Sequence, residues 1–460
     1  MRRLTQSDVL IVPCETQVRE FDAKLLLACF AAEHGFSVLV GSKKEINKRL
    51  GSLPRSIFVS KSLTKRNLLN YELLRRLGHG VICGDEEALV YASPDSYLHH
   101  KVAPATMRKA RALLAWGPQN EQLWKDYTGY QGCPIHITGN ARMDLLRPEL
   151  RSFFDSDVDR LRQRYGPFLL VNTNFSRLNH YFPGQSRQRR ALESGPPVRG
   201  IDLGRGLAGH KARLYESFLD MVPAVAAACP NHTVIVRPHP SERQETWREI
   251  TRECPNVEVV NEGNVVPWLL ASEVLIHNGC QTAVEAYLLE APAIAYQPVT
   301  SKDFDLQLPN LLSHRAFDQP SLLEMLGAQL RGDLERSPAE AAKQEELIDE
   351  YVAARSGAFA CERIVSIVEA FAADPGFDAM PSLPSRLLAK VVAHGQGLLQ
   401  RVEAYWPGHH NNRVFLRHMF PGADLAFVEG QIGNYAKRLG RFGAVRARER
   451  YPNVFEIDAA

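Results

Sequence analysis

The stretch from His232 to Tyr296 constrains the fold of this 460-residue chain more than any other segment. Within it, short apolar runs alternate with longer amphipathic runs. A short apolar run bounded by turn residues is typical of a buried strand, and a longer amphipathic run is typical of a helix. Strands that alternate with helices in this way predict a parallel sheet with right-handed crossovers. We expect strands at 233–236, 257–260, 274–276 and 293–295, and helices at 241–253, 266–271 and 281–290.

Two polar clusters stand directly after strands of this stretch. The first consists of Arg237, Pro238, His239, Pro240, Ser241 and Glu242. The second consists of His277, Asn278, Gly279, Cys280, Gln281 and Thr282. Ligands of parallel α/β sheets bind outside the carboxyl ends of the strands. Both clusters are therefore candidate binding segments, and we add Asn174, which follows a further expected strand at 168–171.

The second cluster has the chemistry of an anion site. Gly279 allows backbone to approach a ligand closely. The helix that follows directs its free amides and the positive end of its dipole at the same place. Glu285 lies about one turn into this helix, where its carboxylate can accept hydrogen bonds from a sugar diol. The alternative is a capping box formed by Thr282 and Glu285, which needs no ligand.

The first cluster places a histidine between two prolines. Pro238 and Pro240 fix the backbone around His239 and prevent an early helix start. A histidine held there can donate to a phosphate and changes its charge near neutral pH. The alternatives are a structural histidine at a strand end and, for Arg237, an ordinary salt-bridge partner.

The rest of the chain predicts a second sheet and a helical end. Further strands are expected at 9–13, 36–40, 57–59, 81–83, 112–116 and 134–138. The expected class is α/β, with two Rossmann-like domains and a C-terminal helical extension, an arrangement that resembles the GT-B architecture, in which two such domains face a cleft. We expect domains at 1–150 and 151–371 and the extension at 372–460, and the resemblance implies that the first domain binds the acceptor and the second the nucleotide donor. Residues 181–204 have no period and are expected to form a mobile loop.

Four carboxylates at expected strand ends of the first domain are candidate catalytic groups. Glu15 and Asp22 belong to a dense run of charges after the first strand, and Asp85 and Glu86 follow the fourth. Clustered carboxylates suit general-base or nucleophile chemistry, because like charges raise one another's pKa. The alternative is that these acids occupy the first turns of helices, where carboxylates are ordinarily stabilised.

Charge and motif content exclude several classes of function. A net charge of +3 argues against nucleic-acid binding as the main task. No P-loop, no GxSxG motif and no GxGxxG motif after an expected strand occurs, and His99-His100 and His409-His410 lack the spacing of a helical metal site, so we expect no metal. No apolar run is long enough to span a bilayer, so we expect a cytoplasmic protein. A basic strip is expected to be either a solvated helix face or a peripheral contact with the inner membrane surface; its residues are Lys437, Arg438, Arg441, Arg446, Arg448 and Arg450.

Several of these segments resemble known families. The turn Gly139-Asn140-Ala141-Arg142-Met143-Asp144 resembles the GN-x-R-x-D turn of CDP-glycerol glycerophosphotransferase-like and sugar epimerase-like proteins. Arg237 to Pro240 resembles the His-Pro motif of bacterial transferases that use CMP-activated sugars, including the Kdo and sialic acid transferases. The charged run from Glu15 to Lys24, with Asp85-Glu86-Glu87, is similar to the surface carbohydrate biosynthesis proteins.

These resemblances imply a GT-B glycosyltransferase of surface polysaccharide biosynthesis. They imply that His239 contacts the donor phosphate or cytidine, that Glu285 holds the ribose, and that amides near Cys280–Thr282 hold phosphate. The sequence departs from many relatives at Cys280 and Gln281, where those carry serines. The expected donor substrate is a CMP-sugar such as CMP-Kdo, with no tightly bound cofactor, and the expected acceptor is a glycan or glycolipid. The alternatives are a CDP-alditol phosphotransferase, a UDP-sugar 2-epimerase-like enzyme and a non-catalytic scaffold.

Overall fold

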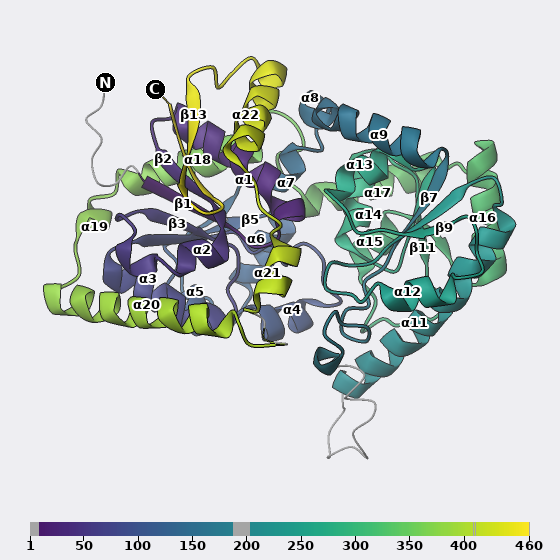
Figure 1. Ribbon diagram of the computed structural model, residues 1–460, viewed down its shortest axis with the longest axis horizontal. Coiled ribbons are helices and arrows are strands. Elements are labelled where there is room, and N and C mark those ends of the chain that lie inside the picture. Colours follow the sequence, from purple (N-terminus) through teal and green to yellow (C-terminus); the bar gives the residue numbers. More distant parts are fainter. Residues whose placement is uncertain (1–8, 187–202, 408, 410, 460) are drawn as a thin grey trace. The chain divides into compact units, whose positions relative to one another are not determined.

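The computed structural model describes residues 9–186, 203–407, 409 and 411–459 (Figure 1). These residues divide into two compact units. Unit 1 holds residues 9–89, 94–153 and 346–459, and unit 2 holds residues 90–93 and 154–345. The predicted boundaries differ from this division because residues 346–371, assigned to the second domain from the sequence, belong to unit 1. Most of the predicted loop at 181–204 lies outside the described residues.

Unit 1 is built on an eight-stranded sheet with the order β13-β14-β2-β1-β3-β4-β5-β6. The six strands from the N-terminal part are all parallel; β14 adds antiparallel to β2, and β13 adds antiparallel to β14 at the edge of the sheet. The strands are β1 (Val9–Cys14), β2 (Ser37–Ser42), β3 (Ile57–Ser60), β4 (Gly80–Cys83), β5 (Ala112–Ala115), β6 (Ile135–Ile137), β13 (Val445–Tyr451) and β14 (Val454–Ala459). The parallel part has the flavodoxin-like order, in which the order of the strands across the sheet reverses between β1 and β3.

The helices of unit 1 precede, separate and follow these strands. They are α1 (Gln17–Glu33), α2 (Lys43–Asn47), α3 (Leu68–Leu77), α4 (Pro94–Lys101), α5 (Pro104–Met107), α6 (Pro118–Lys125), α7 (Ala141–Asp144), α8 (Pro148–Arg151), α18 (Ala360–Ala372), α19 (Pro375–Asp378), α20 (Leu383–Glu403), α21 (Arg413–Met419) and α22 (Leu425–Leu439). Short 3-10 turns lie at η1 (Leu50–Ser52), η2 (Lys65–Asn67) and η3 (Ser152–Phe154), and α17 (Pro338–Tyr351) crosses the boundary between the units. The predicted helical C-terminal part is present, but it ends in the β13–β14 hairpin.

Unit 2 is built on a six-stranded parallel sheet with the order β12-β11-β10-β7-β8-β9. Its strands are β7 (Phe168–Asn172), β8 (Thr233–Arg237), β9 (Val257–Val259), β10 (Val274–His277), β11 (Ala293–Tyr296) and β12 (His314–Ala316). Its helices are α9 (Asp155–Tyr165), α11 (Leu203–Ala228), α12 (Glu245–Ile250), α13 (Val265–Ala271), α14 (Gln281–Leu288), α15 (Gln307–Leu311) and α16 (Gln319–Arg331), with a 3-10 turn at η4 (Pro183–Gln185). This is the strand order of the Rossmann fold, so the predicted α/β class with two Rossmann-like sheets is confirmed.

The turn after β6 anchors the segment that precedes α18. Gly139 has a φ of +77°, and a Cβ there would meet the carbonyl oxygen of Ala353 at 2.7 Å, so only glycine fits. Asn140 caps α7 by accepting from the Arg142 amide. The buried carboxylate of Asp144 accepts the amides of Ala360 and Cys361, each at 2.8 Å, at the start of α18. The GN-x-R-x-D turn therefore holds unit 1 together.

Candidate functional site

The candidate binding site of unit 2 lies where β7 and β10 are neighbours in the sheet. The register aligns Asn172 of β7 with His277 of β10 on one side and with Arg237 of β8 on the other. From β7 the chain continues to β8 and β9, whereas from β10 it continues to β11 and β12 at the opposite edge. The strand order therefore reverses between β7 and β10, and ligands of open α/β sheets bind at such a switch point.

Three asparagines are buried around this switch point with polar atoms that have no hydrogen-bond partner among the described residues. Asn278 is 5% exposed, and neither its Oδ1 nor its Nδ2 has a partner. The Oδ1 atoms of Asn172 and Asn310 also lack a hydrogen-bond partner among the described residues, although Asn172 Nδ2 donates to Thr282 Oγ1 at 3.2 Å. Asn310 lies beside the turn at Gly279. Because a buried polar group without a partner costs about 1–3 kcal/mol, such groups mark a place that a ligand can complete.

His277, at the end of β10, is instead a satisfied core residue. Its Nδ1 accepts from the Gly279 amide at 3.0 Å, and its Nε2 lies 2.8 Å from Ser313 Oγ. Because Nδ1 accepts, the neutral ring carries its proton on Nε2. Burial lowers the pKa of His277 to about 3. His277 therefore stays neutral and holds the turn at Gly279, where the φ of +80° favours glycine.

Helix α14 presents an uncapped N-terminus at the switch point. Cys280 is the N-cap residue, and no side chain caps the helix, so the alternative of a capping box between Thr282 and Glu285 is wrong. Thr282 Oγ1 instead lies 2.6 Å from Cys280 Sγ. Burial raises the pKa of the Cys280 thiol to about 11, and the nearby amides of Thr282 and Ala283 oppose this shift. The N-terminus of α14, with half-buried Gln281 in its first turn, is thus a place where the helix dipole would stabilise an anion.

The loop after β8 holds His239 in one orientation. Its Nδ1 accepts from the Ser241 amide at 3.1 Å, and its own amide lies 3.3 Å from Glu242 Oε1. The neutral ring therefore carries its proton on Nε2, which is a hydrogen-bond donor. His239 and the following Pro240 are both half-buried, as is Asn174 in the loop after β7. This geometry is what the predicted phosphate contact of His239 requires.

Glu242 joins the loops after β7 and β8. Its buried carboxylate accepts from Thr173 Oγ1, from the Phe175 amide and from Trp247 Nε1. Burial raises the pKa of Glu242 to about 7, and these donors oppose the shift. Sequence reasoning placed Glu242 in the first cluster without giving it a role. The carboxylate fixes the loop that carries His239.

Arg237 points away from the switch point and toward the loop before α13. Its Nη2 donates to the carbonyl oxygens of Glu262 and Gly263, and its guanidinium lies over the ring of Trp268. Burial lowers the pKa of Arg237 to about 10, and the nearby carboxylate of Glu285 opposes the shift. Glu285 is itself 3% exposed. Arg237 thus stabilises the loop before α13. A direct phosphate contact by Arg237 stays a prediction.

One cation that sequence reasoning missed, Lys211, lies close to Cys280, and a second, Arg177, lies close to Lys211. Lys211 is on α11, and its ammonium has no hydrogen-bond or ion-pair partner among the described residues. Burial lowers the pKa of Lys211, Arg177 lowers it further, and Asp305 and Cys280 raise it. These influences place Lys211 near the N-terminus of α14. No motif marks Lys211 or Arg177, because they reach the site from segments far away in the sequence.

In unit 1 the predicted carboxylates meet lysines at the carboxyl edge of β1 and β3. Glu20 is 2% exposed and forms ion pairs with Lys24, at 2.7 Å, and with Lys61. Glu15 is exposed and lies 3.2 Å from Lys43 and 3.3 Å from Lys61. Burial would raise the pKa of Glu15, but the two lysines lower it to about 2. The same effect of Lys24 and Lys61 holds the pKa of Glu20 well below its usual range.

The structure separates the other three predicted carboxylates. Asp85 is buried, accepts from Tyr97 OH at 3.1 Å, and has a pKa raised by burial to about 7. Asp22 contacts α22, where its Oδ1 lies 3.4 Å from Gln431 Nε2. Glu86 is buried near Lys61, and its Oε2 lies 3.8 Å from Arg142 Nη1 without a hydrogen-bond partner among the described residues. Lys61 therefore links Glu15 and Glu86, whereas Asp22 and Asp85 have structural contacts of their own.

The basic strip of the C-terminal part is largely engaged within unit 1. Arg441 pairs with Glu33 and Glu362, and Arg448 pairs with Glu456 and Asp458, while Arg438 donates to the carbonyl oxygen of Ser152. These contacts favour a solvated surface over the membrane contact, although Arg446, Arg448 and Arg450 lie on β13 and not on the predicted helix. Among the residues that the structure describes, every helix is too short or too polar to cross a lipid bilayer.

No family model matches the chain, and no curated protein matches it. Solved structures do. The wall teichoic acid polymerase TagF is 9% identical, with a TM-score of 0.50 over 80% of this chain and 90% of that one. The UDP-GlcNAc 2-epimerase of Methanocaldococcus jannaschii, solved with UDP-GlcNAc and UDP, is 11% identical, with a TM-score of 0.49 over 79% of this chain and 99% of that one. At such low identity the likeness to TagF shows the fold alone, and that fold is GT-B-like.

Proposed function

We propose that the chain is a transferase that takes a nucleotide-activated sugar or polyol at the switch point of unit 2. The observation that carries this proposal is the set of buried amides around Asn278 beside the uncapped N-terminus of α14. His239 Nε2 and the first-turn amides of α14 would bind the phosphate, and Glu285 would accept from the ribose. Charge develops on the leaving phosphate during transfer, and donors fixed in advance stabilise such charge most effectively.

We further propose that the donor carries a diphosphate. Lys211 supplies positive charge near Cys280, and Arg177 adds a second cation near Lys211. A diphosphate bears more charge than a monophosphate and gains more from two nearby cations. These cations therefore favour a CDP- or UDP-linked donor over CMP-Kdo.

The acceptor, a glycan or glycolipid, would bind unit 1, and Glu86 is the proposed general base. A base must be able to take up a proton near the working pH. Glu15, with a pKa of about 2, is too weak a base, and Asp85 is engaged by Tyr97. Glu86→Gln should therefore lower turnover by roughly 100-fold or more and leave nucleotide affinity unchanged, whereas the control Asp22→Asn should leave turnover intact.

Thermal unfolding with different nucleotides tests the donor site. A nucleotide at about 100 times its Kd adds about 2.7 kcal/mol to the free energy of unfolding. CDP and UDP should raise the Tm more than CMP does, and Lys211→Met should remove most of that difference. Arg213→Met, on the same helix, is the matched control and should leave the difference unchanged.

Each other outcome assigns a different function. A larger shift with CMP than with CDP or UDP would reject the diphosphate and restore the CMP-sugar. Rearrangement of a UDP-sugar without any acceptor would identify a 2-epimerase. If no nucleotide shifts the Tm, the scaffold alternative replaces the enzyme.

A further inference from the structure

Helix α20 is attached to unit 1 through its small residues. Ala389, Ala393 and Gly397 follow one another at intervals of four, and all three are buried. A Cβ at Gly397 would lie only 2.6 Å from the carbonyl oxygen of Lys48, so the helix backbone packs directly against η1 and α3. A small-residue face places the axis of α20 close to the unit and turns its opposite face outward.

That opposite face consists of large apolar side chains. With 3.6 residues per turn, they occupy an arc of roughly 180° on the side away from the buried alanines. Several are more than half exposed, and Val391 reaches 70%. The exposed side chains on α20 are Leu383, Leu387, Leu388, Val391, Val392, Leu398, Leu399 and Val402. Monomeric soluble proteins rarely expose so continuous an apolar face unless it binds something.

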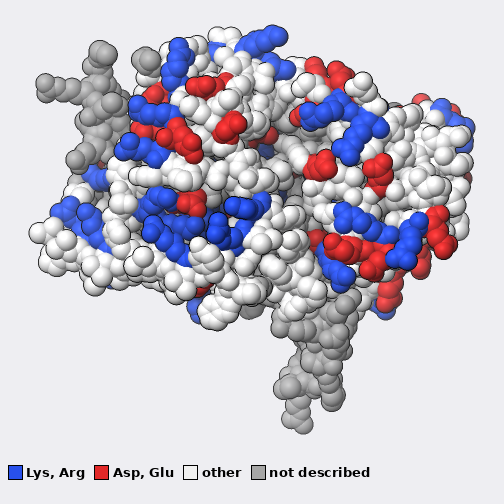
Figure 2. Space-filling view, in the orientation of Figure 1, with Lys and Arg blue, Asp and Glu red and all other residues white. Residues whose placement is uncertain are grey.

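Positive charge borders this face. Lys390 and Arg401 are exposed next to the apolar arc. Residues 379–423 contain five Lys or Arg but only one acid, Glu403, which accepts from Asn411 Nδ2 at 2.6 Å. Figure 2 shows uncharged side chains along the edge of unit 1 where α20 lies, with Lys and Arg gathered just beside them. The surface therefore combines an apolar face with a positive border.

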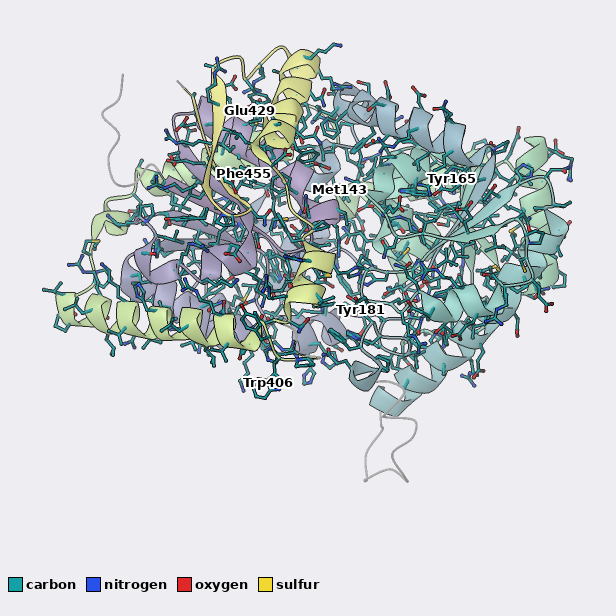
Figure 3. All side chains as sticks on the ribbon, viewed as in Figure 1. Met143, Tyr165, Tyr181, Trp406, Glu429 and Phe455 are labelled. Atoms are coloured by element: carbon teal, nitrogen blue, oxygen red, sulfur yellow. The ribbon has the colours of Figure 1, made fainter. Side chains whose placement is uncertain are left out.

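Two aromatic residues stand at the end of α20. Tyr405 is 72% exposed and Trp406 is 65% exposed. Figure 3 shows Trp406 projecting from the end of the helix away from unit 1. Tyrosine and tryptophan are enriched at membrane–water interfaces, because their rings are apolar at one end and polar at the other.

We infer that α20 lies in the plane of an anionic lipid bilayer, with its apolar face between the acyl chains and its cations at the headgroups. A wide apolar arc, a basic border and terminal aromatics are together the features of an interfacial helix. A second copy fits less well. A two-helix seam uses a narrower apolar stripe, and two-fold symmetry would bring the same cations together. This contact is independent of the reaction in unit 2 and lies on a different surface from the basic strip.

Tryptophan fluorescence provides a direct test, because the other four tryptophans are buried and Trp406 is exposed. Vesicles of phosphatidylglycerol and phosphatidylethanolamine should shift the emission of the full chain to shorter wavelength, and Trp406→Phe should abolish that shift. In flotation assays, Leu398→Gln with Val402→Gln should lower binding at least tenfold. Vesicles of phosphatidylcholine alone should bind much more weakly.

Matched controls separate this surface from the alternatives. Lys437→Gln with Arg450→Gln, in the basic strip, and Phe317→Ser, an exposed aromatic of unit 2, should leave vesicle binding unchanged. Binding that survives the double substitution in α20 but is lost in the strip variant would overturn the inference. So would a dimer in sedimentation experiments that dissociates in the α20 variant while no vesicle binding is seen.

Discussion

The two sheets have the same kind of switch point but opposite chemistry at it. In unit 1 the carboxyl ends of β1 and β3 carry full charges that are paired with one another, with Glu20 between Lys24 and Lys61. In unit 2 the carboxyl ends of β7 and β10 carry neutral amides, and neither polar atom of the Asn278 side chain has a partner in the described part of the chain. The charges at the first edge are paired within the protein, whereas the amides at the second edge lack partners among the described residues.

This difference distinguishes residues that stabilise the fold from residues whose polar atoms would gain a partner only when a ligand binds. A buried ion pair with good geometry is strongly destabilised when one partner is removed, because the other charge is then left uncompensated. A buried amide without a partner destabilises the fold already, so removing it loses little. The two edges should therefore respond in opposite ways to substitution.

The largest effect should come from Lys61→Met in unit 1. Removing this ammonium leaves Glu20 buried with one counter-ion and Glu15 with one exposed partner. We expect the free energy of unfolding to fall by about 3–5 kcal/mol, measured by urea denaturation.

Lys43→Met is the control, because among the residues that the structure describes Lys43 pairs with the exposed carboxylate of Glu15 alone, and its loss should cost less than about 1 kcal/mol. Adding Glu20→Gln to Lys61→Met should restore part of the loss. If both lysine variants lose the same small amount, the network contributes nothing to the stability of unit 1.

The sequence patterns located the strands and the polar loops that follow them, but they did not identify which groups the charged residues contact. Buried apolar runs such as those of β1 and β7 identify strands because burial on both faces leaves no other arrangement. The β13 strand was read as helix because most of its side chains are charged and exposed, so its pattern lacks an apolar period. Lys61 and Lys211 were missed for another reason: each lies far in sequence from the charged groups near it, and only the topology brings them together.

An intermediate effect should appear in the pH dependence of unit 2. Burial raises the pKa of Glu242 from 4.5 to about 7, so the folded state holds a proton that the unfolded state releases above pH 4.5. This contribution to stability is complete below the unfolded pKa and is lost as pH rises toward 7. Asp85 and Asp144 titrate in the same direction, so the test is a comparison with Glu242→Gln.

In that comparison, both proteins are unfolded in urea at intervals between pH 5 and pH 7.5. A single proton difference is worth about 1.4 kcal/mol per pH unit. The slope should become shallower in Glu242→Gln by a fraction of that value. The variant should also be less stable at every pH, because its amide NH2 would face the Thr173, Phe175 and Trp247 donors. Equal slopes would show that Glu242 ionises normally.

The smallest effect on stability, and the clearest contrast with Lys61, should come from Asn278→Ala. The side chain is buried, but it makes no hydrogen bond with the described residues, so its removal relieves an unmet desolvation penalty while it opens a small cavity. These two terms oppose each other, and without ligand we expect a change within about 1 kcal/mol in either direction. With nucleotide, the same variant should lose most of the Tm increase seen for the wild type, because the partner of those amide atoms is the ligand. Leu69→Ala, an exposed apolar residue of unit 1, serves as a control and should keep the full increase. A large loss of stability without ligand, together with an unchanged nucleotide effect, would place Asn278 among the residues that hold the fold and would remove the distinction between the two edges.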